Sequence, residues 1–257
     1  MSSLPIMLQI LPISGLPEFQ PNDDVGALIA ERLRMGVPAL EPGDVVVVTQ
    51  KIVSKAEGRF VRLEDVVPST QAIALAAETN KDPALVELVL SESSAVIRTA
   101  PNVLITRHRS GHVMANAGID ASNIGPDRSG QVLLLPKDAH ASAANIRSAI
   151  QQHSGIAPAV LVCDSFGRPW RMGTVNIAIG LAGMPAVVDQ RGDRDRNGRE
   201  LQVTQIAVAD AIAAAAGLVM GEASEGLPVA IVRGWKPNAS DRTSDALLRP
   251  IEQDLFT

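Results

Sequence analysis

An apolar run at residues 157–163 constrains the fold most, because it predicts a buried strand that ends at a carboxylate. Asp164 and Ser165 follow the run directly, and an acid beside a hydroxyl at a strand end can bind a divalent metal. Arg168 and Arg171 come next, and guanidinium groups bind phosphate or carboxylate in fork geometry. The alternative is that Asp164 caps a turn and the arginines tie a loop to the core.

The composition allows a full core and disfavours nucleic acid as a partner. With 257 residues, 46% of them hydrophobic, the chain can form one large domain or two lobes sharing a cleft. It has 23 Lys and Arg against 28 Asp and Glu, so no general positive field is available for a phosphate backbone. Tyr is absent, and four Phe and two Trp offer few stacking platforms.

We expect a cytoplasmic protein without a membrane span. The single cysteine, Cys163, excludes an internal disulfide framework and a zinc site of several cysteines. Residues 1–5 lack the basic and apolar regions of a signal peptide. Residues 201–221 form the most apolar long stretch, but they are rich in alanine and include Asp210 and several polar side chains, so membrane insertion is disfavoured.

The order of the expected elements favours an α+β fold with a mixed sheet and flanking helices, as two lobes sharing a cleft. One domain spans residues 1–257, with a lobe boundary near 125–130, where the composition is that of a surface loop. The strand, helix and strand expected within residues 132–163 predict a βαβ unit with parallel pairing. Helices are expected at 25–33, twice within 64–94, at 139–153 and at 202–219; further strands are expected at 45–48, 95–98, 103–106, 113–115 and 229–232.

Residues 49–59 follow the strand at 45–48 and combine the parts of a phosphate site. Lys51 and Lys55 supply positive charge, and hydroxyls and backbone N–H groups supply hydrogen bonds. The spacing of a Walker P-loop is absent from the whole sequence. The alternative is a pair of lysines on a solvated strand end.

Two more loops carry carboxylates. Asp120, with Asn123 three residues later, can form an Asx turn, or it can meet Asp164 at a shared pair of cations. The segment 221–228 contains Glu222 and Glu225 between glycines. It suits a helix C-cap and connector, although a bound cation would relieve the unfavourable position of acids at a helix C-terminus.

The remaining ionisable residues suggest structural roles. Asp210 is the only charge between Glu200 and Glu222, so we expect it to pair with an arginine inside the fold. The four histidines show no strong metal-ligand spacing and are expected to be exposed. Cys163, at the end of an apolar strand, is expected to pack in the core rather than act as a nucleophile.

Several segments together resemble the coenzyme F420:L-glutamate ligases, also called F420-0:γ-glutamyl ligases. The likeness spans about residues 8–234, and the chain would be a stand-alone ligase. Each motif is weakly specific, but their joint order and spacing are hard to obtain by chance. The matching segments are 11–19, Gly43–Asp44 with 49–59, 117–120 with Ser122–Asn123, 164–171 and 229–234.

The resemblance implies GTP-dependent addition of L-glutamate to a deazaflavin precursor through an acyl phosphate. It also implies two divalent ions, Mg²⁺ or Mn²⁺, with K⁺ in some members, and a homodimer. The ions would be held by Asp120, Asp164, Ser165 and Glu222. The nucleotide would contact Leu16, Pro17, Glu18, Phe19, Gln50, Lys55, Asn123, Met220, Gly221, Glu222, Ala223, Ser224, Glu225, Gly226 and Leu227. Arg168 and Arg171 are added from their own chemistry as candidates for substrate carboxylate or phosphate.

Two alternatives to the ligase stay open. One is a metal-dependent phosphohydrolase that uses the same carboxylates. The other is a nucleotide- or metal-binding module that has the fold without turnover.

Overall fold

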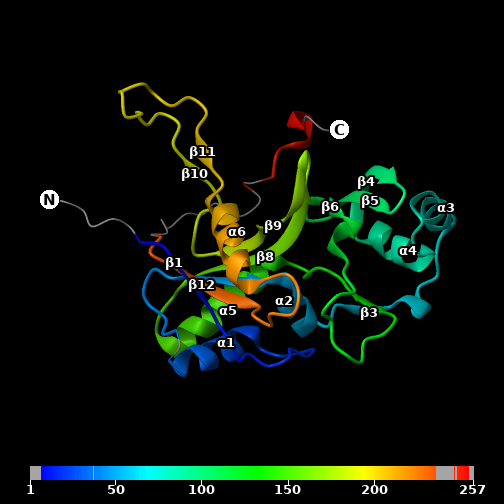
Figure 1. Cartoon of the computed structure of the whole chain (residues 1–257), viewed down its shortest axis with the longest axis horizontal. Helices are drawn as coiled ribbons and strands as arrows, with labels where there is room; N and C mark the ends of the chain where they lie inside the picture. The colour runs from blue at the N-terminus through cyan, green and yellow to red at the C-terminus, as the bar shows by residue number, and fades with distance from the viewer. Residues whose placement is uncertain (1–6, 37, 236–245, 247, 255–257) are drawn as a thin grey trace.

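A mixed five-stranded sheet forms the centre of the molecule (Figure 1). This computed structural model describes residues 7–36, 38–235, 246 and 248–254. The strand order is β1-β12-β2-β8-β9; β2 and β8 run parallel, and the other neighbouring pairs of this sheet are antiparallel. The strands are β1 (Gln9–Pro12), β2 (Val45–Thr49), β8 (Ala159–Arg168), β9 (Arg171–Ala182) and β12 (Val229–Arg233).

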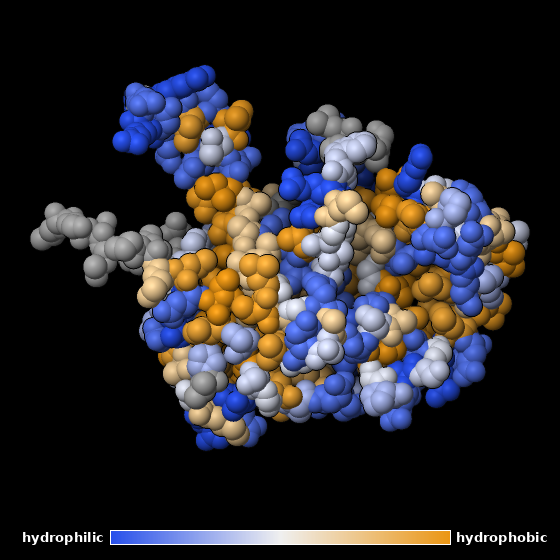
Figure 2. Space-filling view, viewed as in Figure 1, coloured by the Kyte–Doolittle hydropathy of each residue, from blue (hydrophilic) through white to orange (hydrophobic). Residues whose placement is uncertain are grey.

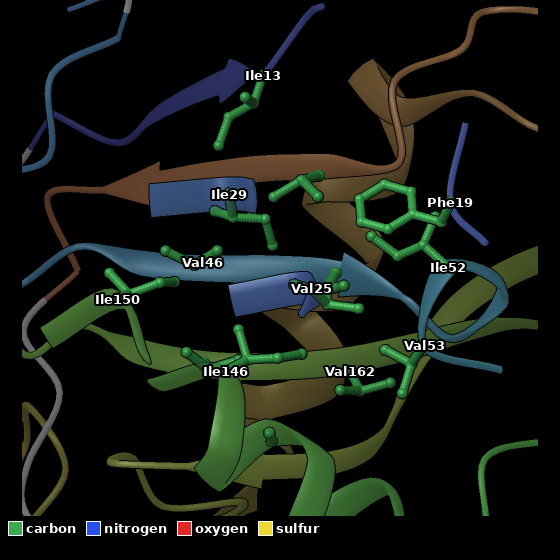
Figure 3. Close-up of a cluster of buried hydrophobic side chains, with 14 of the residues drawn as sticks. Ile13, Phe19, Val25, Ile29, Val46, Ile52, Val53, Ile146, Ile150 and Val162 are labelled. Carbon is green, nitrogen blue, oxygen red and sulfur yellow. The ribbon is translucent and has the colours of Figure 1, made fainter. Parts of the chain in front are cut away.

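Helices cover both faces of this sheet, so the valines of β2 are all fully buried. Val46 and Val48 face a cluster with α1 (Val25–Arg34) and α5 (Ala139–Ser154), part of which Figure 3 shows. Val45 and Val47 face the opposite way, onto α6 (Val208–Met220). The alternation follows from the two-residue period of a strand, and it fixes the register of the sheet.

A third hydrophobic cluster lies under the smaller sheets, away from the central one. Asp82 caps α4, whose first residue is Pro83, so the chain breaks between the two expected helices of this region. The elements here are β3 (Phe60–Arg62), η1 (Leu63–Asp65), α3 (Thr70–Thr79), α4 (Pro83–Ser91), β4 (Ser93–Ala100), β5 (Val103–His108), β6 (Val113–Ala115), η2 (Asn116–Gly118) and β7 (Gln131–Leu133).

A hydrophilic arm projects from the body between β9 and α6 (Figures 1 and 2). Its base is the antiparallel pair β10 (Val188–Asp189) and β11 (Gln205–Ile206). The short helix η4 (Ile251–Gln253) lies near the C-terminal end of the chain. No helix within the described ranges is long and apolar enough to cross a membrane.

The structure confirms the α+β class and the mixed sheet, and it corrects two elements. The predicted βαβ pairing is wrong, because β7 pairs antiparallel with β3 while β8 takes β2 as its parallel neighbour. The predicted helix at 202–219 begins only at Val208, because residues 205–206 belong to the arm. The prediction about a signal peptide at residues 1–5 lies outside the described residues, and the lobe boundary near 125–130 stays a prediction.

The expectation for Asp210 is also wrong, and the expectation of exposed histidines is wrong for His108 and His112, whereas His153 is exposed. Among the residues that the structure describes, no arginine pairs with Asp210; its carboxylate accepts a hydrogen bond of 2.9 Å from the backbone N–H of Ala178. Burial raises the pKa of Asp210, and this hydrogen bond opposes the shift. His108 and His112 are buried, joined through the hydroxyl of Ser110, rather than exposed.

Candidate functional site

A cavity of about 880 Å³ lies where the parallel pairing of β2 and β8 ends, at Thr49 and Cys163. This position follows the rule that ligands of such sheets bind outside the carboxyl ends of parallel strands. Six separate chain segments line it, so the fold gathers residues that are far apart in sequence. The lining includes every residue that the family resemblance assigned to nucleotide or metal: Leu16, Pro17, Glu18, Phe19, Gln50, Lys55, Asp120, Asn123, Asp164, Ser165 and residues 220–227.

Helix α2 (Gln50–Ala56) brings two lysines into the cavity. It begins directly after β2, without a loop, and Lys51 and Lys55 lie four residues apart, on the same face of the helix. Each ammonium is paired with an acid of the cavity wall, Lys51 with Asp120 at 2.8 Å and Lys55 with Glu18. Lys55 is buried, so the simple alternative of two lysines on a solvated strand end is wrong for it.

Asp120 combines both of the roles considered for it. Its Oδ1 accepts a hydrogen bond of 2.7 Å from the Ser122 backbone N–H, which is the expected Asx turn. Partial burial raises its pKa, but hydrogen bonds from Lys51 and Ser122 outweigh this effect, and the pKa is lowered overall. Asp120 therefore presents an ionised carboxylate to the cavity.

Asp164 is the acid of the site whose ionised form is disfavoured. Burial, and to a smaller extent the negative charge of Asp120, raise its pKa to about 7. The Ser165 backbone N–H, the charge of Lys51 and a hydrogen bond from Gln50 act in the opposite direction without cancelling the shift. The two acids thus influence each other across the cavity, and their combined negative charge is incompletely balanced by the side chains present.

The loop after α6 closes one side of the cavity. Gly221 has φ +73° and ψ 179°, a conformation that glycine adopts readily, and its N–H caps α6 by donating to the Gly217 carbonyl. Glu225 accepts a hydrogen bond of 2.8 Å from the Ala223 N–H, which folds the loop back on itself. Asn123 donates its side-chain N–H to the Ala223 carbonyl at 2.9 Å, so the loops at 120–123 and 221–228 are joined directly.

The oxygen-bearing side chains of the cavity fit a divalent ion that also takes ligands from a bound substrate. Within the described ranges, no three His, Cys, Asp or Glu side chains come close enough together to hold a metal ion. Asp120, Asp164 and the hydroxyl of Ser165 nevertheless line the same cavity, where the charge of the acids is under-compensated. Mg²⁺ commonly takes one or two carboxylates and completes its shell with water and substrate phosphates, so these residues suit it.

Arg168 and Arg171 do not line this cavity. They lie on the hairpin formed by β8 and β9, where Arg168 donates to the Met172 carbonyl at 3.3 Å and Arg171 is exposed. Their expected binding of substrate carboxylate or phosphate stays a prediction. Cys163 also lines the cavity, and burial raises the pKa of its thiol, which favours the inert packing role expected for it.

Sequence reasoning expected Lys51 at a phosphate and missed its pairing with Asp120, and it gave no role to Asn176. Lys51 is the partner of Asp120, and its spacing from Lys55 would have indicated a shared face had residues 50–56 been recognised as a helix. Asn176 lies on β9, opposite Ser165 in the sheet register. Its side chain fills the space left by the missing Cβ of Gly217, a contact that no sequence motif indicates.

Comparison with known families places the chain. The model of the F420-0:gamma-glutamyl ligase family matches residues 15–234, a range that contains every segment lining the cavity. The chain belongs to this family.

Curated members of the F420-0:gamma-glutamyl ligase family resemble the chain over nearly its full length. The coenzyme F420:L-glutamate ligase of Methanothermobacter thermautotrophicus is 43% identical over 251 residues, covering 97% of this chain and 98% of the relative. The ligase of that name from Methanopyrus kandleri is 42% identical and covers both chains completely. The one from Halorubrum lacusprofundi is 45% identical, covering 96% of this chain and 95% of the relative.

Proposed function

We propose that this protein is a ligase that joins L-glutamate through a γ-glutamyl amide bond to the deazaflavin coenzyme precursor F420-0, with GTP as the phosphoryl donor. Family membership and the names of the curated relatives support the acceptor and the amino acid. The observation that carries the proposal is the gathering of all the expected nucleotide and metal residues in one cavity.

The chemistry requires an activated carboxylate. A carboxylate oxygen of the precursor attacks the γ-phosphorus of GTP, and the bond to the β-phosphate oxygen breaks to release GDP. The amine of L-glutamate then attacks the carbonyl carbon of the acyl phosphate, phosphate leaves, and the amine gives up a proton. Catalysis of such transfers is mainly positioning and charge neutralisation.

The residues of the cavity match these tasks. Lys55 is buried in the cavity wall and pairs with Glu18. Its ammonium would bind a phosphate group of the nucleotide. The loop at 220–227 offers the exposed backbone of a glycine-containing turn to the nucleotide. Asp120, Asp164, Ser165 and Glu222 would hold two Mg²⁺ or Mn²⁺ ions. Such ions neutralise developing charge on the phosphate oxygens.

Three further properties belong to the proposal. K⁺ is a possible additional ion, and a homodimer is the proposed assembly, both from the family resemblance. The cytoplasm is the proposed location, because a lone cysteine fits a reducing compartment.

A reconstituted reaction tests the proposal. The purified protein is incubated with GTP, Mg²⁺ or Mn²⁺, L-glutamate and F420-0, and the deazaflavin product is followed by mass spectrometry. We expect a glutamate-dependent mass increase with stoichiometric release of GDP and phosphate. Loss of GTP without glutamate transfer would indicate the phosphohydrolase, and binding without turnover would indicate the non-catalytic module.

Two substitutions separate the metal and nucleotide roles. Asp164→Asn is expected to abolish metal-dependent turnover, because it removes the negative charge of a metal ligand. The circular dichroism spectrum is expected to stay unchanged, because asparagine has nearly the same size as aspartate. Lys55→Ala is expected mainly to weaken nucleotide binding, measured by calorimetry with GDP. Undiminished turnover in Asp164→Asn would remove Asp164 from the site, and a change confined to glutamate affinity in Lys55→Ala would remove its phosphate role.

A further inference from the structure

The ammonium group of Lys51 sits in a shell of three oxygen atoms. Its Nζ lies 2.8 Å from Asp120 Oδ2, 2.9 Å from the Ser122 carbonyl oxygen and 3.1 Å from Ser122 Oγ. A carboxylate, a carbonyl and a hydroxyl are also the oxygen types that a hard cation binds. Lys51 therefore fills a cation position at Asp120 with a charge that belongs to the chain itself.

Both carboxylate oxygens of Asp120 already have donors. Oδ1 accepts from the Ser122 backbone N–H, and Oδ2 accepts from Ser122 Oγ at 2.8 Å as well as from Lys51. A metal ion approaching Oδ2 therefore has to displace a donor. The bonds from Ser122 are part of a local turn, whereas Lys51 reaches Asp120 on a flexible stem from another element, so Lys51 is the donor that can leave.

The charge of Lys51 neutralises Asp120, with which it pairs at 2.8 Å. A divalent ion at the same place would neutralise the carboxylate with twice the charge. An ammonium and a divalent ion so close together repel each other, since the Coulomb energy between like charges grows as their separation falls.

We propose that Lys51 is a built-in competitor of the divalent ion at Asp120: its ammonium occupies the position in the nucleotide-free protein and leaves it when nucleotide phosphates arrive. This inference rests on the proposed function, because it takes Asp120 as a metal ligand and a nucleotide as the substrate. Lys51 shares a helix face with Lys55, so a phosphate group held by Lys55 offers it a nearby partner. Lys51 thus acts as a positioning residue that couples metal binding to nucleotide binding, and such coupling is reciprocal.

Metal binding to the nucleotide-free protein tests the inference without any turnover. Mn²⁺ affinity is measured by the electron paramagnetic resonance signal of unbound Mn²⁺ for the wild type and Lys51→Met. We expect Lys51→Met to bind Mn²⁺ at least about tenfold more tightly, because a neighbouring positive charge is removed. Lys51→Arg keeps the charge and is expected to bind as weakly as the wild type.

Lys137→Met is the matched control. It changes the net charge of the chain by the same amount at an exposed position outside the cavity, so its Mn²⁺ affinity is expected to equal that of the wild type. An unchanged or weaker affinity in Lys51→Met would overturn the inference, because it would make Lys51 a support of the site. An equal gain in Lys137→Met would overturn it too, since the effect would then be one of net charge.

The two proposals fail in different ways. If Asp120→Asn leaves Mn²⁺ binding unchanged in the Lys51→Met background, the metal site itself is misplaced and the proposed function loses its support. If Lys51→Met does not fold, nuclear magnetic resonance of the ¹⁵N-labelled lysine ammonium groups of the wild type replaces it, with Lys51→Arg for assignment. We expect the Lys51 signal to shift or disappear on saturation with Mg²⁺ and GDP together, and an unchanged signal would overturn the inference.

Discussion

At the residue scale, a buried acid of this protein stays ionised when several basic side chains surround it. Glu92 is buried and is paired with Arg59 at 2.8 Å, with Arg109 at 2.5 Å and with His108 at 3.6 Å. Its burial raises its pKa, but the nearby His108 imidazole and the two arginines lower it to about 2. Glu92 therefore stays ionised at neutral pH, unlike Asp164, whose partners are weaker.

Glu92→Gln is predicted to destabilise the protein in a pH-dependent way. The folded pKa lies below the ordinary value of 4.5, so the stabilisation is fully present above about pH 4.5 and is lost as the pH falls towards 2. Urea denaturation should show a loss on the order of 3 kcal/mol at pH 7 that shrinks through this window. Glu64→Gln is the control, because its exposed pair with Arg62 contributes little. A loss that is constant with pH would contradict the assignment.

At the element scale, the turn after α6 depends on a glycine. A Cβ on Gly221 would lie 2.1 Å from Glu225 Cδ, at a backbone φ of +73° that other residues rarely adopt. The carboxylate of Glu225 is fixed by its hydrogen bond to the Ala223 N–H, and Ala223 in turn is bonded to Asn123. A side chain at position 221 would therefore disturb the cavity wall at three linked residues.

Gly221→Ala is predicted to weaken GDP binding at least about tenfold, because both the collision and the strain act on the loop. Calorimetry with GDP measures the effect. Gly43→Ala is the matched control: Gly43 also has a positive φ, +92°, but its Cβ would meet nothing within 4 Å and it lies outside the cavity. We expect the control to lose stability and to keep its GDP affinity. Equal affinity losses in both variants would show that general destabilisation is the cause.

The elements predicted correctly are those with strong local signals. The helix at Val25 follows the capping residue Asp24, and β2 consists of β-branched residues after a turn. The parallel partner of β8 was missed because β2 lies more than a hundred residues earlier, and no local pattern records such a pairing. Helix α2 was missed because it is short and begins without a side-chain cap.

Site prediction had the same limit. The acids Asp120 and Asp164 were identified from their predicted places at strand ends. For Asp164 that place is wrong, because β8 continues through it to Arg168, but the structure does bring both acids to one cavity. The family resemblance supplied the loop at 220–227, whose composition alone favours a simple connector. The pairing of Lys51 with Asp120 depends on helix α2 meeting the loop at 120–123 across 69 positions of sequence, which only the folded chain defines.

At the scale of the whole molecule, the cavity joins segments from Leu16 to Pro228. A ligand that contacts all of these segments binds only the folded chain, because the unfolded chain has no such binding site. Such a ligand stabilises the fold by about 2.7 kcal/mol at a hundred times its dissociation constant. The cavity should therefore report on ligands through global stability.

Thermal unfolding is predicted to shift upward when nucleotide and metal bind together. For a chain of this size, the gain corresponds to a rise in Tm of roughly 5 to 10 °C, measured by calorimetry with GDP and Mg²⁺. Asp164→Asn should show a smaller rise with the pair but a similar rise with GDP alone. An unchanged Tm at saturating ligand in the wild type would mean that the cavity does not bind the nucleotide.

The position of β12 between β1 and β2 has a consequence for how the protein is made. On the ribosome, the first two strands of the central sheet emerge long before the strand that separates them, so they wait with unpaired edges. A nascent chain that has not yet exposed residues 229–233 lacks the strand that joins β1 to β2. The cavity walls therefore cannot assemble until β12 has emerged, and a chain truncated before it would leave no partly working fragment.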